Sequence, residues 1–126
     1  MPFQVLLAED TEMNRMLVRI LLTRMGFEVD EADNGQQAVE ALARKRYDLV
    51  LMDCMMPVMD GYEATRILRA REAEAGQERV PVIALTASAI AGDRERCRQA
   101  GMDDYLSKPF QVDDFKAIVQ RYLKTG

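Results

Sequence analysis

The sequence predicts an α/β fold in which five parallel strands form one open sheet with helices on both faces. Five short apolar runs alternate strictly with five helical patterns, and such alternation produces parallel pairing through right-handed crossovers. The runs at 5–8 and 49–52 are apolar at every position, as expected for strands covered on both sides. Five strand–helix units are too few to close an eight-stranded barrel, so we predict an open, doubly wound sheet.

The first half of the chain contains three predicted strands and two predicted helices. The strands lie at 4–8, 28–32 and 49–52, and the helices at 12–25 and 35–45. Gly26 ends the first helix, because glycine readily adopts the left-handed conformation that often follows a helix. Asn34 and Gly35 mark the start of the second helix.

The second half contains the remaining two strands and three helices. The strands lie at 82–86 and 104–107, and the helices at 62–75, 91–100 and 112–123. Gly76 and Gly101 close the third and fourth helices. Pro57, Pro81 and Pro109 all fall in the predicted connections, which supports these limits.

Length and composition indicate one globular domain over residues 1–126, with 48% apolar residues. The 17 basic and 21 acidic side chains give a net charge of −4, which disfavours nucleic acid as a partner because nucleic acid attracts clustered positive charge. The sequence shows neither a signal-peptide pattern nor an apolar run long enough to cross a membrane. We therefore expect a cytoplasmic protein without membrane insertion. A monomer is expected, and dimerisation is left open.

Cysteine and histidine content excludes several kinds of chemistry. Two cysteines do not make a disulfide framework, which agrees with a reducing cytoplasm. Alternation along the third strand points Cys54 away from Asp53, so we interpret Cys54 as a small buried apolar residue and not as a reactive thiol. The chain has no histidine, which excludes histidine-based acid–base catalysis and histidine-ligated zinc.

Functional side chains follow four of the five predicted strands. Asp53 ends the third apolar run, and Glu9 and Asp10 end the first. Thr86 ends the fourth strand and Lys108 follows the fifth, so parallel strands bring all five side chains to one edge of the sheet. Three converging carboxylates repel one another unless a cation is present, and hard oxygen ligands suit Mg²⁺. A nucleophilic carboxylate with metal ligands, a hydroxyl and an ammonium group is typical of phosphoryl transfer.

The chain resembles a receiver domain of the two-component response-regulator family. The resemblance rests on five motifs in order, and it covers essentially the whole chain: Leu6-Leu7-Ala8-Glu9-Asp10, Met52-Asp53, Met59-Asp60-Gly61, Ala84-Leu85-Thr86-Ala87 and Tyr105-Leu106-Ser107-Lys108-Pro109. The segments 60–66 and 101–105 further resemble receivers of hybrid sensor histidine kinases. This family implies a flavodoxin-like sheet with strand order 2-1-3-4-5.

The resemblance also implies a role for each matching residue. Asp53 is the expected phospho-acceptor, and the expected donor is a phosphohistidine of a histidine kinase or a histidine-containing phosphotransfer protein. The implied Mg²⁺ ligands are the side chains of Glu9, Asp10 and Asp53 and the carbonyl of Met55. Lys108, Thr86 and the amide of Ala87 would contact the phosphoryl group, and movement of Thr86 would couple to rotation of Tyr105. A cis Lys108–Pro109 bond is a further expectation. Such a chain catalyses its own phosphorylation and dephosphorylation in a signalling role, without turnover of a separate substrate.

Taken singly, several of these residues also fit other roles, and two other protein classes share parts of the pattern. Glu9 or Asp10 alone fits a helix cap, Lys108 alone an ordinary surface lysine, and Thr86 alone a strand residue. Phosphatases that form an aspartyl phosphate carry a second aspartate two residues after the nucleophile, where this chain has Met55. A nucleotide- or flavin-binding protein needs a glycine-rich first turn, whereas residues 8–12 are acidic and lack glycine.

Two further expectations concern partners and the lifetime of the phosphoryl group. The helix at 12–25 carries more apolar residues than one buried stripe needs, so we expect a docking surface formed by Asn14, Leu17 and Phe110. Met55 and Ser88 offer little to orient an attacking water, so we expect slow hydrolysis of the acyl phosphate.

Overall fold

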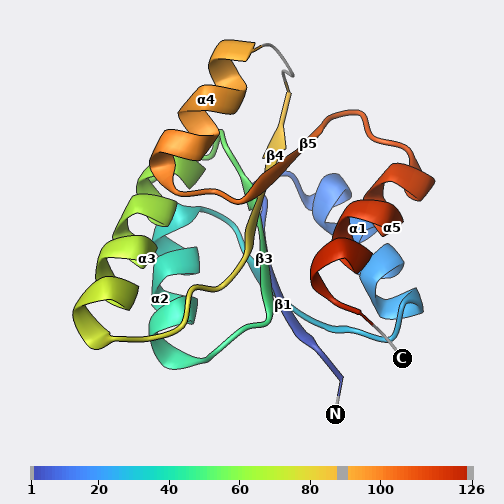
Figure 1. The fold of residues 1–126 in the computed structure, drawn as a ribbon. Helices are drawn as coiled ribbons and strands as arrows, with labels where there is room; N and C mark the ends of the chain where they lie inside the picture. The colour runs from blue at the N-terminus through green and yellow to red at the C-terminus, as the bar shows by residue number, and fades with distance from the viewer. Residues whose placement is uncertain (1, 88–90, 125–126) are drawn as a thin grey trace.

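A computed structural model, which describes residues 2–87 and 91–124, contains one five-stranded sheet (Figure 1). All four strand pairs are parallel and the strand order is β2-β1-β3-β4-β5, so the predicted topology is confirmed. The strands are β1 (Gln4–Ala8), β2 (Glu28–Ala32), β3 (Leu49–Asp53), β4 (Val82–Thr86) and β5 (Asp104–Ser107). β3 extends one residue beyond its predicted end and includes Asp53.

One helix follows each strand. The helices are α1 (Glu12–Arg24), α2 (Gly35–Arg44), α3 (Gly61–Ala75), α4 (Ala91–Ala100) and α5 (Val112–Tyr122). Four of them differ from the predicted limits by one residue at one end. α3 begins at Gly61 because Asp60 is its N-cap and accepts a hydrogen bond from the amide of Glu63 at 2.8 Å.

Two apolar cores lie on opposite faces of the sheet. α2, α3 and α4 cover one face, and α1 and α5 cover the other (Figure 1). Alternation along β1 places Leu6 and Ala8 in the first core and Val5 and Leu7 in the second. Every residue of β3 and β4 is buried, as expected for central strands covered on both sides.

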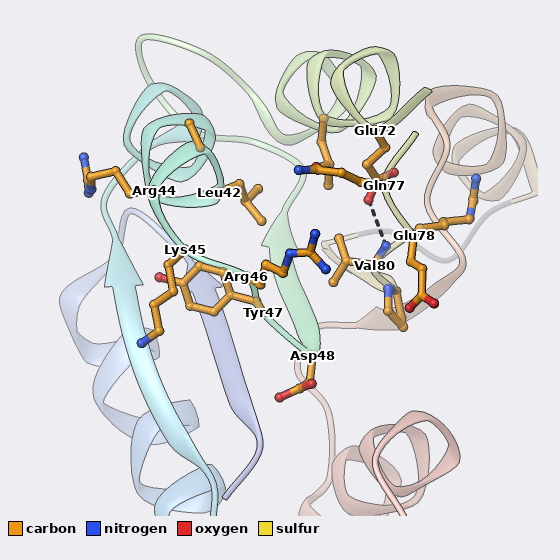
Figure 2. Close-up of a pocket in the computed structure, with 14 residues that line it drawn as sticks. Leu42, Arg44, Lys45, Arg46, Tyr47, Asp48, Glu72, Gln77, Glu78 and Val80 are labelled. Carbon is orange, nitrogen blue, oxygen red and sulfur yellow. Dashed lines mark hydrogen bonds between the residues drawn. The ribbon is translucent and has the colours of Figure 1, made fainter. Parts of the chain in front are cut away.

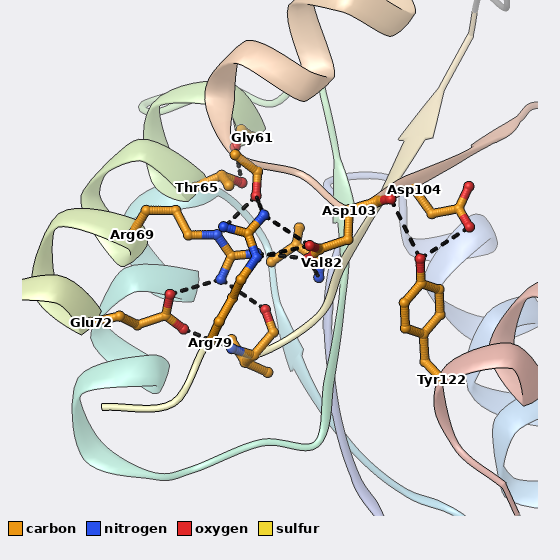
Figure 3. Close-up of polar contacts among 11 residues, drawn as sticks. Gly61, Thr65, Arg69, Glu72, Arg79, Val82, Asp103, Asp104 and Tyr122 are labelled. Atoms are coloured by element: carbon orange, nitrogen blue, oxygen red, sulfur yellow. Dashed lines mark hydrogen bonds and ion pairs between the residues drawn. The ribbon is translucent and has the colours of Figure 1, made fainter. Parts of the chain in front are cut away.

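Arg69 of α3 fastens the amino-terminal ends of β4 and β5 (Figure 3). Its guanidinium donates to the carbonyl oxygens of Val80 and Gly101 at 2.8 Å each, and to the Glu72 carboxylate at 2.8 Å. It also forms an ion pair with Asp103 at 2.8 Å, and Asp103 in turn accepts a hydrogen bond from the amide of Val82. A mostly buried guanidinium with this many acceptors is a rigid cross-link between elements. The opposite, carboxyl-terminal ends of β4 and β5 are thereby held in register.

Candidate functional site

The carboxyl-terminal edge of the sheet brings together side chains from three strands. Asp53 is the last residue of β3, Glu9 directly follows β1, and Lys108 directly follows β5. The backbone fixes their positions: the Glu9 amide donates to the carbonyl of Ala32 at 3.0 Å, and the Lys108 amide donates to the carbonyl of Thr86 at 2.7 Å. The Lys108–Pro109 bond is cis. Three strands of the parallel sheet, β1, β3 and β5, therefore deliver two acids and one base to a common point.

Three carboxylates and one ammonium group lie within contact distance there. Ligand oxygens of Glu9, Asp10 and Asp53 all lie within 4.8 Å of one another. Lys108 Nζ is 2.5 Å from Oε1 of Glu9 and 3.1 Å from Oδ2 of Asp53. Glu9 and Asp53 are buried, with 1% and 6% of their surface exposed, whereas Asp10 is exposed. The cluster thus has a buried floor and an open side that faces solvent.

Electrostatics push the pKa values of the two buried acids apart. Burial raises the pKa of Asp53 to about 7, and the neighbouring Glu9 carboxylate adds to the rise. Burial also acts to raise the pKa of Glu9, but hydrogen bonds from Asp53, Lys108 and the Thr11 amide outweigh it and lower the pKa to about 2. Burial acts to lower the pKa of Lys108, while its contacts with Glu9 and Asp53 prevail and raise it. Below pH about 7 the pair Glu9 and Asp53 therefore retains one proton.

The donor set fits a hard divalent cation. Three carboxylates against one ammonium group leave excess negative charge, and the raised pKa of Asp53 reflects the free-energy cost of ionising both buried acids. Carboxylate oxygens are the ligands that Mg²⁺ prefers, and it commonly keeps several waters, for which the open side beside Asp10 has room. The residues present therefore fit Mg²⁺.

The other predicted site residues lie around this cluster. Thr86 is buried at the end of β4, and Ala87 follows it and is exposed. The Met55 amide donates to Oδ1 of Asp53 at 3.2 Å, while the Met55 side chain is 66% exposed. Tyr105 lies half-buried in β5 with the guanidinium of Arg94 4.7 Å from its ring centre. Ser88 lies outside the described residues.

Three residues that the sequence analysis did not assign to the site hold Glu9 in place. The Thr11 amide and the Asn14 side chain donate to the Glu9 carboxylate at 3.1 and 3.3 Å, and Arg15 donates to the Glu9 carbonyl at 2.7 Å. Asn14 was singled out only as a docking residue. The available signal was its position five residues after Glu9, in the first turn of the following helix.

A cavity of about 270 Å³ adjoins the acidic cluster on its α1 side. It is mainly apolar, and its lining includes Leu17, Phe110 and Asn14 together with Glu9 and Lys108. The neighbouring surface of α1 is also apolar, because several of the apolar residues that the buried stripe of this helix does not need are exposed. The exposed fractions are 73% for Met13, 45% for Met16, 49% for Leu17 and 41% for Ile20. Val18, Leu21 and Leu22 form the buried stripe.

A larger cavity, of about 460 Å³, lies at the opposite end of the sheet (Figure 2). The loop after α2, with Arg46 and Tyr47, forms one wall, and Glu72 and Val80 form the other. It contains none of the clustered acids at the carboxyl-terminal edge. Size alone therefore does not identify the chemical site.

Comparison with known proteins decides the family. Residues 5–120 match the family model of the response regulator receiver domain. The chain belongs to the response regulator receiver family. Sensor protein GacS of Pseudomonas syringae pv. syringae is 44% identical to this receiver domain over 119 residues, which cover 94% of the chain and 13% of GacS. The receiver domain thus spans a small fraction of that relative, and it is a domain of two-component signalling.

Solved structures agree with this assignment. The receiver domain of sensor histidine kinase PA1611 from Pseudomonas aeruginosa PAO1 is 46% identical with a TM-score of 0.86, covers 99% of this chain and 100% of that one, and has a magnesium ion in its active site cleft. The receiver domain of Ssk1 from Saccharomyces cerevisiae, crystallised with the histidine phosphotransfer protein Ypd1, is 29% identical with a TM-score of 0.92, covering 96% of this chain and 88% of that one. The predicted resemblance, including the likeness to receivers of histidine kinases, is confirmed. Among the described residues, no helix has the length and apolar character needed to span a bilayer.

Proposed function

We propose that this receiver domain accepts a phosphoryl group on Asp53 from a phosphohistidine of a partner protein. The observation that carries the proposal is the convergence of Glu9, Asp10 and Asp53 with Lys108 at the carboxyl-terminal edge of the sheet. An oxygen of Asp53 attacks the phosphorus, the bond from phosphorus to the imidazole nitrogen breaks, and the electron pair stays on that nitrogen. The chain has no histidine, so the donor belongs to another domain or protein.

Each neighbouring residue has a distinct part in this transfer. The Lys108 ammonium, already 3.1 Å from Asp53, is close enough to pair with a phosphoryl oxygen once Asp53 is phosphorylated. The Thr86 hydroxyl and the Ala87 amide, at the end of the adjacent strand, would donate to the other oxygens. Glu9, Asp10, Asp53 and the Met55 carbonyl would hold Mg²⁺, which supplies positive charge that neutralises the phosphoryl oxygens during transfer.

The open apolar surface beside the site suits a protein donor. The cavity lined by Leu17 and Phe110 and the exposed apolar side chains of α1 adjoin Lys108, so a partner docked there can present its histidine to Asp53. The crystallised complex of Ssk1 with Ypd1 supports a histidine phosphotransfer domain, or the corresponding part of a histidine kinase, as the partner. We further propose that the receiver acts in the cytoplasm as a monomer.

The direct test is phosphoryl transfer from a purified phosphohistidine donor, such as a histidine phosphotransfer domain phosphorylated beforehand. Label should pass to the wild-type receiver in Mg²⁺ and not in excess chelator, and Asp53→Asn should abolish it. Asp60→Asn is the matched control, because asparagine caps a helix as well as aspartate and Asp60 serves as the cap of α3. Transfer to Asp53→Asn at the wild-type level would refute the proposal.

A further inference from the structure

The two cysteines of the chain lie together beneath α4, although 42 residues separate them in the sequence. Cys54 directly follows Asp53, and Cys97 lies near the middle of α4. Their sulfur atoms are 3.9 Å apart, and both residues are buried in the core on the α2, α3 and α4 face. From the sequence, Cys54 was interpreted as a small buried apolar residue and not as a reactive thiol, and the structure gives it a thiol neighbour.

We propose that Cys54 and Cys97 are a redox-sensitive pair that closes to an intramolecular disulfide and fastens α4 to the end of β3. The oxidant is a peroxide. Two S–H bonds and the O–O bond break, one S–S bond forms, and the two electrons and two protons from the thiols reduce the peroxide to two water molecules. The sulfur atoms, now 3.9 Å apart, must approach to a bonded distance of about 2.05 Å.

Burial raises the pKa of the Cys54 thiol to about 12, so the proposed oxidation requires local opening that admits water and the oxidant, and α4 is the element expected to open. Its sequence is the most polar of the five helices, and Cys97 and Ala100 are the buried apolar residues among its described side chains. Two stacking contacts supplement them: Arg94 lies over the ring of Tyr105, and Arg96 lies 4.2 Å from the ring centre of Tyr62. Elements with so little buried apolar surface open locally at a lower free-energy cost than the core does.

The cross-link would join the phospho-acceptor strand to a helix across the core. The Cys54 amide donates to the carbonyl of Leu85 at 3.0 Å, and its carbonyl accepts from the amide of Gly61 at 3.0 Å, so the β3 side of the link is rigid. A disulfide to Cys97 would therefore restrict α4 and leave β3 where it is. Transient disulfides of this kind are the form in which reducing compartments use cysteine pairs for regulation.

The test treats the folded wild-type chain with hydrogen peroxide and then counts free thiols after unfolding in an alkylating agent. The expected result is loss of both thiols, a mass lower by two hydrogen atoms, a single cross-linked peptide containing Cys54 and Cys97, and slower amide hydrogen exchange in α4. Reducing agent should restore both thiols and the original exchange rates. Cys54→Ala and Cys97→Ala each keep one thiol, and neither should show the exchange change.

Three results would overturn the proposal. Both thiols could remain free in the folded chain and react only after unfolding, the sulfurs could gain oxygen atoms without cross-linking, or the disulfide could join two chains in a reducible dimer. The last result is recognised from its mass, and it would persist in one of the single alanine variants. Because the measurement uses thiol count and exchange, its outcome is independent of whether Asp53 is the phosphorylation site.

Discussion

At the scale of single residues, the pair Glu9 and Asp53 favours the binding of a cation at the site. Ionising both of two buried, neighbouring carboxylates costs free energy. Below pH about 7 one proton therefore stays with the pair, although Lys108 contacts both acids. Asp53, the proposed nucleophile, is the member whose pKa is raised, to about 7, and it would have to be ionised to attack phosphorus. Displacing that proton is therefore part of activating the nucleophile.

This proton predicts how Mg²⁺ binding depends on pH. The folded chain without metal holds the Asp53 proton up to pH about 7, and binding through that carboxylate must release it. Mg²⁺ affinity should therefore be nearly constant above that pH and fall about tenfold per pH unit below it. Isothermal titration in buffers of different ionisation enthalpy measures the affinity and the released proton together. An affinity that does not change between pH about 5 and 8 would contradict the coupling.

Met55 gives a prediction about the lifetime of the phosphoryl group. It lies two residues after the acceptor, and its exposed thioether offers no strong hydrogen bond to an attacking water. Met55→Glu should therefore speed loss of the phosphoryl group by about tenfold or more, measured as the decay of the acyl phosphate. Val58→Glu, 82% exposed in the same loop, adds the same charge and should leave the decay unchanged. Equal decay rates in wild type and Met55→Glu would exclude Met55 from the control of water.

At the scale of elements, α3 is packed directly against the backbone of the acceptor. A Cβ atom added at Gly61 would lie 2.2 Å from the Asp53 carbonyl oxygen and 2.8 Å from Cγ of Met52. The first turn of α3 thus approaches β3 as closely as it does because residue 61 has no side chain. Any larger residue there must displace the helix or the strand that carries Asp53.

Gly61→Ala should accordingly lower the free energy of unfolding by about 1–3 kcal/mol and reduce the rate of phosphorylation. Gly92→Ala in α4 is the matched control, because a Cβ there would meet no atom within 4 Å. An exposed helical Gly→Ala change should raise stability by up to about 1 kcal/mol. Denaturant unfolding measures both values, and equal stability of the two variants would show that the close approach at Gly61 is unimportant.

α1 gives the corresponding prediction for the partner. Leu17→Glu places a charge on the exposed apolar surface of α1 beside the cavity, so transfer from a histidine phosphotransfer domain should slow about tenfold or more. Labelling by acetyl phosphate, which needs no docking surface, should be nearly unchanged. Ala43→Glu, exposed on α2, is the control for added charge. Failure with both donors would mean that the change damages the fold, and an effect with neither would place the docking surface elsewhere.

At the scale of the whole molecule, alternation and strand-end position predicted most of what the structure contains. Runs that are apolar at every position identified β1 and β3 as strands covered on both faces, and parallel topology alone brought Glu9, Asp53 and Lys108 together. These features are regular in the sequence, so they can be read without coordinates.

Contacts between elements distant in the sequence could not be predicted in this way. The approach of Cys54 to Cys97, the stacking of Arg94 on Tyr105 and the acceptors of Arg69 depend on how α3 and α4 pack. The periodicity of apolar residues predicts which face of a helix is buried. It does not predict which groups the end of a long polar side chain contacts. The sequence also could not show which apolar side chains of α1 are exposed, because that depends on the elements that pack against the helix.

The central claim, that Asp53 is the phosphoryl acceptor, is tested most directly by intact-mass analysis after incubation with acetyl phosphate and Mg²⁺. The wild type and Asp60→Asn should each gain a single phosphoryl adduct, which disappears when Mg²⁺ is chelated beforehand. Asp53→Asn, which keeps the size of the side chain, should gain none. An undiminished adduct on Asp53→Asn would contradict the assignment of the site.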